Sequence, residues 1–201
     1  MSRIAYVNGR YVKHSKAQVH IEDRGYQFSD GVYEVILVQN DKLIDENAHH
    51  QRLKKSLKSL GINAPMKRGP LSQVINQVIK RNKFSNGIVY IQVTRGVAPR
   101  EHSFPANIKP SLVMTARRLP PKSQSAIEAG VKVIILEDIR WKRCDIKTVS
   151  LLPNVLGKQK AREQGAYEAW MVDKNGLITE GTSTNAWIVS SDGTLITSEL
   201  G

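Results

Sequence analysis

A mixed α/β (α+β) fold in two parts is what the sequence predicts, on three observations. Apolar residues alternate along some stretches and recur every three or four positions along others, which indicates both strands and helices. Asn8-Gly9 lies between two short apolar runs, as in a tight β-hairpin. A polar stretch with adjacent prolines, 119–125, is typical of a linker. We therefore expect an N-terminal α/β domain over 1–118 and a C-terminal β-rich α/β domain over 126–201.

The first part is expected to begin with two hairpins. Residues 4–12 are divided by an Asn-Gly dipeptide, in which both residues tolerate a positive φ. The runs 33–38 and 43–44 form a second candidate hairpin around an Asn-Asp dipeptide. Between the hairpins, 21–34 combines glycine, charged and aromatic residues, a mixture that is unsuited to a core strand. We expect this segment to be a loop that lines a site.

Helical periodicity begins near His49. Leu53, Leu57 and Leu60 fall at positions i, i+4 and i+7, so they form one apolar stripe, with lysines on the opposite face. A second helix is expected after Pro70, because proline suits the first turn of a helix.

The remaining elements are mostly strands. Strands are predicted over 88–94 and 112–115, and the loop between them carries Arg100 and His102. Residues 180–185 are expected to interrupt the β pattern of the second part. The second part is predicted to contain strands over 131–136, 167–172, 177–179 and 186–189 and a helix over 155–164.

The charge balance favours anionic partners. The 201 residues carry 30 Lys and Arg against 18 Asp and Glu, a net charge of +12. The basic residues are spread along the chain, and aromatics make up only 6%, so the chain has no aromatic and arginine ladder for stacking nucleic acid bases. A small anionic substrate or cofactor suits this charge equally well. A non-enzymatic basic module that binds nucleic acid stays open as a remote alternative.

Composition also bears on the compartment. Cys144 is the only cysteine, so it cannot form an internal disulfide, which fits a reducing compartment. The sequence has neither an apolar run long enough to cross a bilayer nor a signal-peptide core at its start. We therefore expect a cytoplasmic protein.

One lysine has unusual neighbours. Lys147 lies among apolar residues and next to small hydroxyl side chains, between a β-rich segment and a helical segment. Desolvation or a nearby cation lowers the pKa of a lysine and frees its amine for carbonyl chemistry. Taken alone, Lys147 is more simply interpreted as a solvated loop lysine. A special role for it therefore depends on the motifs in the rest of the chain.

The segment that carries Lys147 is one of five motifs that follow in a fixed order. They are 22–28 with 30–34, Arg52-Leu53, 94–96 with 100–102, 145–147 with 151–152, and 179–185. This series resembles the pyridoxal-phosphate-dependent aminotransferases of fold type IV, and within that family it is most similar to the D-amino acid aminotransferases. The resemblance covers nearly the whole chain, and five motifs in matching order make it more specific than any single one.

The resemblance implies roles around the cofactor, pyridoxal 5'-phosphate. Lys147 would be the catalytic residue: it would hold the cofactor aldehyde as a Schiff base and then carry the proton of the substrate α-carbon. Glu180 would pair with the pyridine nitrogen and keep it protonated. Arg52 would bind the phosphate, since a guanidinium fork matches phosphate oxygens. Ser183 and Thr184 would also bind the cofactor, with Gly181 and Thr182 ranked lower.

The resemblance also implies how substrate binds. Tyr33, Arg100 and His102 would bind the substrate carboxylate, and the loop that carries Arg100 and His102 would come from the partner subunit of a homodimer. The implied reaction is transamination between a D-amino acid and a 2-oxo acid. No residue is assigned to a metal, and neither a membrane nor a nucleic acid is expected as a partner.

Alternatives within the same fold remain open. Branched-chain (L) aminotransferases and aminodeoxychorismate lyases share a lysine like Lys147 and a glutamate like Glu180. Handedness depends on the side of the cofactor on which the carboxylate is held, which is a matter of placement in space. Family members continue beyond position 201. A protein that truly ended there is therefore expected to bind cofactor weakly.

Overall fold

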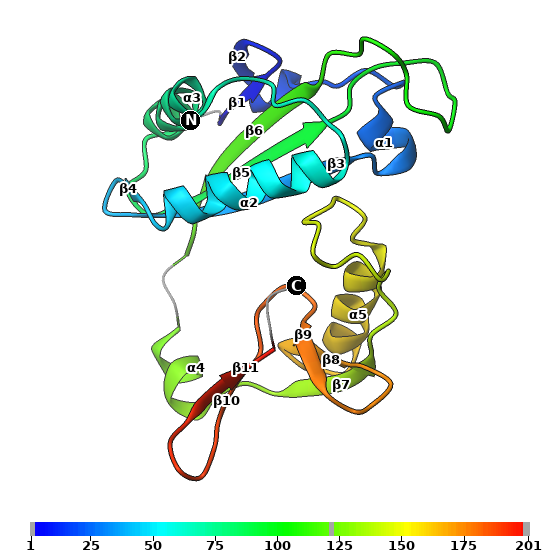
Figure 1. Ribbon diagram of the computed structural model, residues 1–201. Coiled ribbons are helices and arrows are strands. Elements are labelled where there is room, and N and C mark those ends of the chain that lie inside the picture. The colour runs from blue at the N-terminus through cyan, green and yellow to red at the C-terminus, as the bar shows by residue number, and fades with distance from the viewer. Residues whose placement is uncertain (1–2, 121–122, 199–201) are drawn as a thin grey trace. The chain divides into compact units, whose positions relative to one another are not determined.

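The computed structural model describes residues 3–120 and 123–198 (Figure 1). Contacts within the chain divide it into two compact units. The first contains the chain up to Pro120 together with Ile146–Ser150, and the second contains the other residues. The boundary at Pro120 lies inside the predicted linker 119–125, of which residues 121 and 122 lie outside the described residues. The segment that carries Lys147, which the sequence assigns to the second domain, thus packs with the first unit.

The first unit is built on one antiparallel sheet of six strands in the order β2-β1-β6-β5-β3-β4 (Figure 1). Its strands are β1 (Ile4–Val7), β2 (Arg10–Lys13), β3 (Gly31–Gln39), β4 (Lys42–Leu43), β5 (Gly87–Thr94) and β6 (Ser111–Arg118). Both predicted hairpins are confirmed, since β1 pairs with β2 and β3 pairs with β4. The turn residues Asn8 and Gly9 have φ values of 46° and 95°, the left-handed conformation that asparagine and glycine tolerate.

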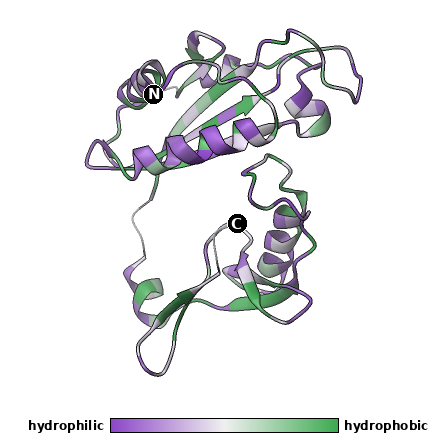
Figure 2. Ribbon diagram, in the orientation of Figure 1, coloured by the Kyte–Doolittle hydropathy of each residue, from purple (hydrophilic) through white to green (hydrophobic). Residues whose placement is uncertain are grey.

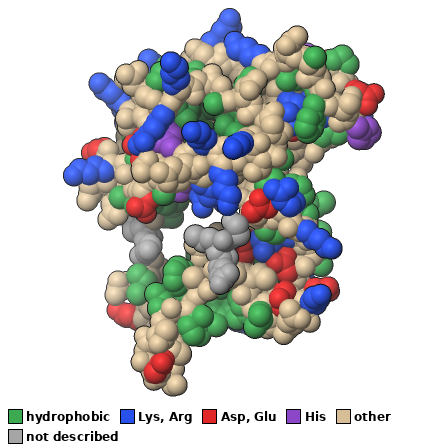
Figure 3. All heavy atoms as spheres, in the orientation of Figure 1, with side chains coloured by type: hydrophobic (Ala, Val, Ile, Leu, Met, Phe, Trp, Pro, Cys, Tyr) green, Lys and Arg blue, Asp and Glu red, His purple; other side chains and the backbone are tan. Residues whose placement is uncertain are grey.

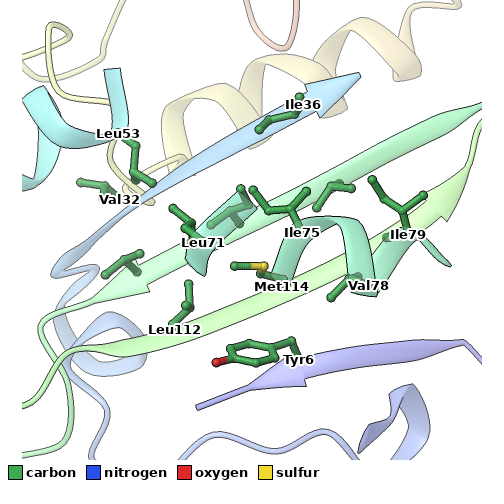
Figure 4. Packing of buried hydrophobic residues seen from close by; sticks show 14 of the residues in the cluster. Tyr6, Val32, Ile36, Leu53, Leu71, Ile75, Val78, Ile79, Leu112 and Met114 are labelled. Carbon is green, nitrogen blue, oxygen red and sulfur yellow. The ribbon is translucent and has the colours of Figure 1, made fainter. Parts of the chain in front are cut away.

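Helices accompany this sheet. They are the 3-10 turn η1 (His14–Lys16), α1 (Arg24–Phe28), α2 (Glu46–Ser59) and α3 (Arg68–Asn82). On α3, Leu71, Ile75, Val78 and Ile79 are buried and pack in the same cluster as Met114 of β6 (Figure 4). Fully burying an aliphatic side chain of this size contributes about 1.5–3 kcal/mol.

The predicted stripe of α2 is also confirmed. Leu53 and Leu57 are buried in the core cluster, and Leu60 packs against it at the C-cap. Many residues of α2 are hydrophilic (Figure 2). Lys and Arg side chains are spread over the visible face of the first unit (Figure 3). No helix within 3–120 or 123–198 is both long and apolar enough to cross a membrane.

The second unit contains a small mixed sheet, two helices and a separate hairpin. Its elements are α4 (Gln124–Ala129), β7 (Val133–Glu137), α5 (Leu152–Glu163), β8 (Glu168–Val172), β9 (Ile178–Gly181), β10 (Trp187–Val189) and β11 (Leu195–Thr197). β7 and β8 are parallel, and α5 lies in the connection between them, because parallel neighbours need a long crossover. β9 pairs antiparallel with β8, and β10 with β11.

Three expectations need correction. Strand β9 continues through Gly181, so Glu180 lies within a strand and the β pattern breaks only after it. The strand β11 was not predicted. The segment 21–34 is not simply a loop, because it contains α1 and the start of β3, and its charged residues Asp23 and Arg24 are each only 3% exposed. Charged residues that hydrogen-bond internally can be buried, which the sequence pattern alone does not reveal.

Candidate active site

Lys147 is held on the first unit by backbone contacts. Its N–H donates to Ser56 Oγ at 3.2 Å, and its carbonyl accepts from Tyr33 N–H at 3.0 Å. The next residue, Thr148, is buried, forms a β-bridge with Val32 and donates its hydroxyl to the carbonyl of Gly31 at 3.0 Å. The base of the Lys147 side chain is therefore fixed against the start of β3.

The amine of Lys147 lies beside a phenol. Nζ is 3.3 Å from Tyr33 Oη and 4.4 Å from the centroid of the Tyr33 ring. The ion pairs found among the described residues include none with Lys147. A half-buried amine next to a hydroxyl, without a carboxylate to bind it, suits a lysine that must react as an amine.

Tyr33 is itself supported by a second tyrosine that the sequence analysis missed. The rings of Tyr33 and Tyr90 are stacked with centroids 5.7 Å apart, and Tyr90 donates to Gln92 Oε1 at 2.7 Å. Burial raises the pKa of Tyr90 to about 12, so this hydroxyl stays neutral. Tyr90 lies on β5, the strand that pairs with β3, and alternation along 88–94 was the available signal.

Arg52 is paired with a buried carboxylate. Its Nε and Nη2 donate to the two oxygens of Glu34 at 2.7 and 2.6 Å, and His49 Nδ1 lies 2.7 Å from Glu34 Oε2. Glu34 is 1% exposed, and these hydrogen bonds raise the pKa of Arg52. Within the described residues, Nη1 of Arg52 makes no hydrogen bond, which leaves one arm of the fork for an anion. The expected role of Arg52 stays a prediction.

Glu180, in the second unit, lies next to an arginine. Arg140 Nη1 donates to Glu180 Oε1, while Arg140 Nε and Nη2 donate to Asp138 at 2.9 and 2.7 Å. Hydrogen bonds from Arg140 lower the pKa of Asp138 to about 2. Thr179 donates to Asp138 at 2.7 Å. The Glu180 carboxylate is thus held by a cation that is shared with a second carboxylate, two partners that the sequence analysis did not identify.

The hydroxyl turn after Glu180 is organised by Glu168. Glu168 is 1% exposed and accepts hydrogen bonds from the hydroxyls of Thr182, Ser183 (2.7 Å) and Thr184 (3.2 Å). Burial acts to raise the pKa of Glu168, but the hydrogen bonds from these hydroxyls outweigh it and lower the pKa to about 2. The hydroxyls of Ser183 and Thr184 thus both donate to Glu168, and the expected role of these two residues in binding the cofactor stays a prediction.

Arg100 and His102 lie together on an exposed loop of the first unit. The guanidinium carbon of Arg100 is 4.6 Å from the centroid of the Phe28 ring, and the His102 ring lies 5.3 Å from the same ring. Among the described residues, no hydrogen bond or ring contact joins this pair to Tyr33. The structure thus brings together Lys147 with Tyr33, and Arg100 with His102, as two separate groups.

Comparisons with known proteins show the family to which this chain belongs. Residues 31–201 match the sequence model of the family described as Amino-transferase class IV. The chain is 42% identical to a D-alanine aminotransferase of Bacillus licheniformis over 186 residues, which are 92% of this chain and 65% of that protein. It is 38% identical to a D-alanine aminotransferase of Staphylococcus epidermidis over 96% of this chain and 67% of that protein.

Solved structures share the fold. The branched-chain amino acid aminotransferase of Escherichia coli superposes with a TM-score of 0.87 at 22% identity, over 98% of this chain and 68% of that one. The 4-amino-4-deoxychorismate lyase of Pseudomonas aeruginosa superposes with a TM-score of 0.78 at 23% identity, over 98% of this chain and 70% of that one. At such identity these likenesses concern the fold, and they confirm the predicted mixed α/β fold of the fold type IV enzymes.

The chain belongs to the class IV aminotransferase family. Within that family, the curated relatives described above are named D-alanine aminotransferases. The chain spans about two thirds of their length, 65% in one case and 67% in the other.

Proposed function

We propose that this protein takes part in pyridoxal-phosphate-dependent transamination between D-amino acids and 2-oxo acids. The observation that carries the proposal is the amine of Lys147, fixed 3.3 Å from the hydroxyl of Tyr33 without a carboxylate partner among the described residues. The identity of 42% to a D-alanine aminotransferase supports the substrate class.

The residues present match the chemical groups of pyridoxal phosphate. Lys147 offers an amine for an aldehyde, and Arg52 offers one guanidinium arm for a phosphate. Glu180 offers a carboxylate for a protonated ring nitrogen, and Arg140 beside it donates a hydrogen bond to that carboxylate. Ser183 and Thr184 are held in one turn by Glu168, whose buried charge fixes their position.

The cofactor, when bound, supplies an electron sink that makes the α-hydrogen of an amino acid acidic and carries the amino group between substrates. Lys147 accepts the α-proton at Nζ and returns it, which is general acid–base catalysis by a positioned amine. Tyr33 orients that amine through its hydroxyl and ring. Arg100 and His102 hold the substrate carboxylate, and a fixed carboxylate decides which face of the α-carbon meets Lys147.

We also propose a homodimer in which the loop of one subunit serves the site of its partner. Arg100 and His102 are exposed on the first unit, and so are the neighbouring apolar side chains Val97 (42% exposed) and Phe104 (65% exposed). Apolar exposure beside the functional side chains suits a loop that inserts into a partner. The reducing cytoplasm, where the exposed Cys144 would remain a thiol, is the compartment we propose.

A visible absorbance spectrum tests the cofactor assignment. Purified protein is measured with and without added pyridoxal phosphate, then again as Lys147→Ala and as the control Lys174→Ala, a lysine in the turn between β8 and β9. We expect a new visible band that is lost in Lys147→Ala and kept in Lys174→Ala. A band that is unchanged in Lys147→Ala would assign the cofactor to another lysine.

Substrate assays test the reaction. We expect D-alanine to donate its amine to 2-oxoglutarate, with no comparable turnover of L-leucine or L-valine. Turnover of those L-amino acids alone would assign the protein to branched-chain chemistry instead. Release of pyruvate from aminodeoxychorismate without an amino acceptor would assign it to the lyases.

A further inference from the structure

The helix α1 is pinned to the end of β5. Asp23, its N-cap, accepts hydrogen bonds from Gly25 N–H at 2.9 Å and from the hydroxyl of Thr94 at 3.0 Å. A Cβ at Gly25 would lie 2.2 Å from Thr94 Cγ2, so the backbone of α1 touches the strand where no side chain fits. A helix of five residues is not stable alone, and these contacts explain why α1 has a fixed place.

Arg24 of α1 reaches from this helix to the loop after β5. It is 3% exposed, and its Nε donates to Asp30 at 2.8 Å. Its Nη1 and Nη2 donate to the carbonyls of Glu101 and His102 at 2.5 and 3.3 Å. One guanidinium fork therefore fixes two consecutive peptide groups, directly after Arg100.

The buried cation is itself balanced. Asp30 accepts from Arg24 and also, through both oxygens, from Arg95 at 2.7 and 3.0 Å. Arg95 donates further to the carbonyls of Leu60 and Gly61 at 2.7 and 3.2 Å. Each guanidinium nitrogen of Arg24 and of Arg95 donates to a carboxylate or a backbone carbonyl, which makes the network rigid.

Phe28 lies four residues after Arg24, on the same side of α1. Its ring contacts the guanidinium of Arg24 at 4.8 Å and that of Arg100 at 4.6 Å, both measured from the guanidinium carbon to the ring centroid. The His102 ring lies 5.3 Å away at 52°. A single aromatic ring thus contacts Arg100 and His102, two of the three side chains that are expected to bind the substrate carboxylate.

We propose that Phe28 and Arg24 are positioning residues that set Arg100 and His102 in place before substrate arrives. The proposal rests on the proposed function, in which Arg100 and His102 bind the substrate carboxylate. Arg24 fixes the peptide groups on both sides of His102, and Phe28 contacts the side chains of Arg100 and His102. Side chains ordered in advance lose less conformational entropy on binding, so substrate binds more tightly.

NMR on the unmodified protein gives a direct test of the contact. Ring protons of Phe28 and His102 should show a nuclear Overhauser effect, with the His102 signals assigned by their loss in His102→Gln. In Phe28→Leu the His102 ring signals should move to the positions of an exposed histidine, and in Phe28→Tyr they should stay near those of the unmodified protein. Absence of the Overhauser effect in the unmodified protein would overturn the proposal.

Trypsin cleavage after Arg100 gives a second test. Phe28→Leu should raise the rate of this cleavage about two- to fivefold, the factor expected for a lost cation–π contact at an exposed site. Tyr26→Leu is the matched control, because Tyr26 lies on the same helix and is 76% exposed. An equal cleavage rate in Phe28→Leu and Tyr26→Leu would count against the proposal.

Kinetics separate positioning from a general structural role. Phe28→Leu should raise KM for D-alanine two- to fivefold while kcat stays within a factor of about two, and Phe28→Tyr should restore KM. An equal loss in kcat with unchanged KM would refute the assignment. If no D-amino acid is turned over, the proposed function fails, but the NMR and cleavage results still decide whether Phe28 and Arg24 order the loop.

Discussion

Two buried carboxylates, one in each unit, organise residues expected to bind the cofactor, and they do so by different chemistry. Glu34 in the first unit is held by the cation of Arg52, with two hydrogen bonds of 2.7 and 2.6 Å. Glu168 in the second unit is held by neutral hydroxyls and a backbone N–H. A carboxylate can thus stay buried either by pairing with a charge or by collecting several neutral donors.

The difference has a consequence for the side chains that do the holding. Arg52 uses two of its nitrogens on Glu34 and keeps Nη1, so it can serve a second anion. The hydroxyls of Ser183 and Thr184 donate their protons to Glu168, so each has only its lone pairs left for another partner. In the first unit, Arg52 therefore keeps one guanidinium nitrogen for an anion. In the second unit, Glu168 instead fixes the position of the turn that carries Ser183 and Thr184.

Removing the cation should have the largest effect. Arg52→Met leaves Glu34 buried with only His49 beside it, and we expect a loss of about 3 kcal/mol in the free energy of unfolding. The value lies at the low end for a broken buried pair because Arg52 is 47% exposed. Urea denaturation of the variant measures it. Lys54→Met, an exposed change on the same helix, should cost less than ~0.5 kcal/mol, and an equal loss in both would remove the distinction.

Replacing the second carboxylate should cost somewhat less. Glu168→Gln keeps the shape of the side chain but removes a charged acceptor of three hydroxyls. We expect it to lower the free energy of unfolding by about 2 kcal/mol. Glu163→Gln, an exposed change on α5, is the control. If Glu168→Gln proved as stable as the unmodified protein, the hydroxyl cluster would not depend on the charge.

Acid should remove this contribution. The folded pKa of Glu168, about 2, lies below its ordinary value of 4.5, so the stabilisation is present above pH 4.5 and is lost as the pH falls toward 2. The difference in unfolding free energy between the unmodified protein and Glu168→Gln should therefore shrink between about pH 4.5 and pH 2. Urea titrations at several pH values measure it. A difference that stays constant through this window would mean that the charge of Glu168 is not the stabilising group.

The smallest effect concerns Lys158, the one cation that pairs with Glu168 within the described part of the chain. Lys158 Nζ lies 3.3 Å from Glu168 Oε2, but its side chain is 42% exposed. Lys158→Met should cost less than about 1 kcal/mol, because an exposed lysine contributes little to such a pair. Thermal or urea unfolding checks this. A loss comparable to that of Arg52→Met would show that both carboxylates depend on charge, and the comparison would no longer hold.

Local signals in the sequence were sufficient for much of the fold. The Asn8-Gly9 turn and the leucine stripe of α2 depend on neighbouring residues, and both predictions are confirmed. The burial of Arg24 could not be predicted, because its partners Asp30 and Glu101 are brought to it by the fold. Sequence spacing alone does not show which charges meet in space.

In the candidate site, too, some residues were predictable from local motifs and others meet only through the fold. Lys147 and Tyr33 were both expected from motifs, and the structure places their side chains 3.3 Å apart. Glu168 was not singled out, although a carboxylate at the start of an apolar strand was a visible signal. Its partners lie 14 to 16 residues further on, across the β8 and β9 hairpin, so their meeting depends on the register of the two strands.

The segment Ile146–Ser150 packs against the start of β3, more than a hundred residues earlier in the chain. Tyr33 N–H bonds to the carbonyl of Lys147, and the Thr148 hydroxyl bonds to the carbonyl of Gly31, across 114 and 117 residues. During synthesis, the strand edge at Gly31 therefore waits for its partner until residue 150 has left the ribosome. Lys147 therefore reaches its place only when the first unit is completed, and a nascent chain halted before that point would expose an open strand edge.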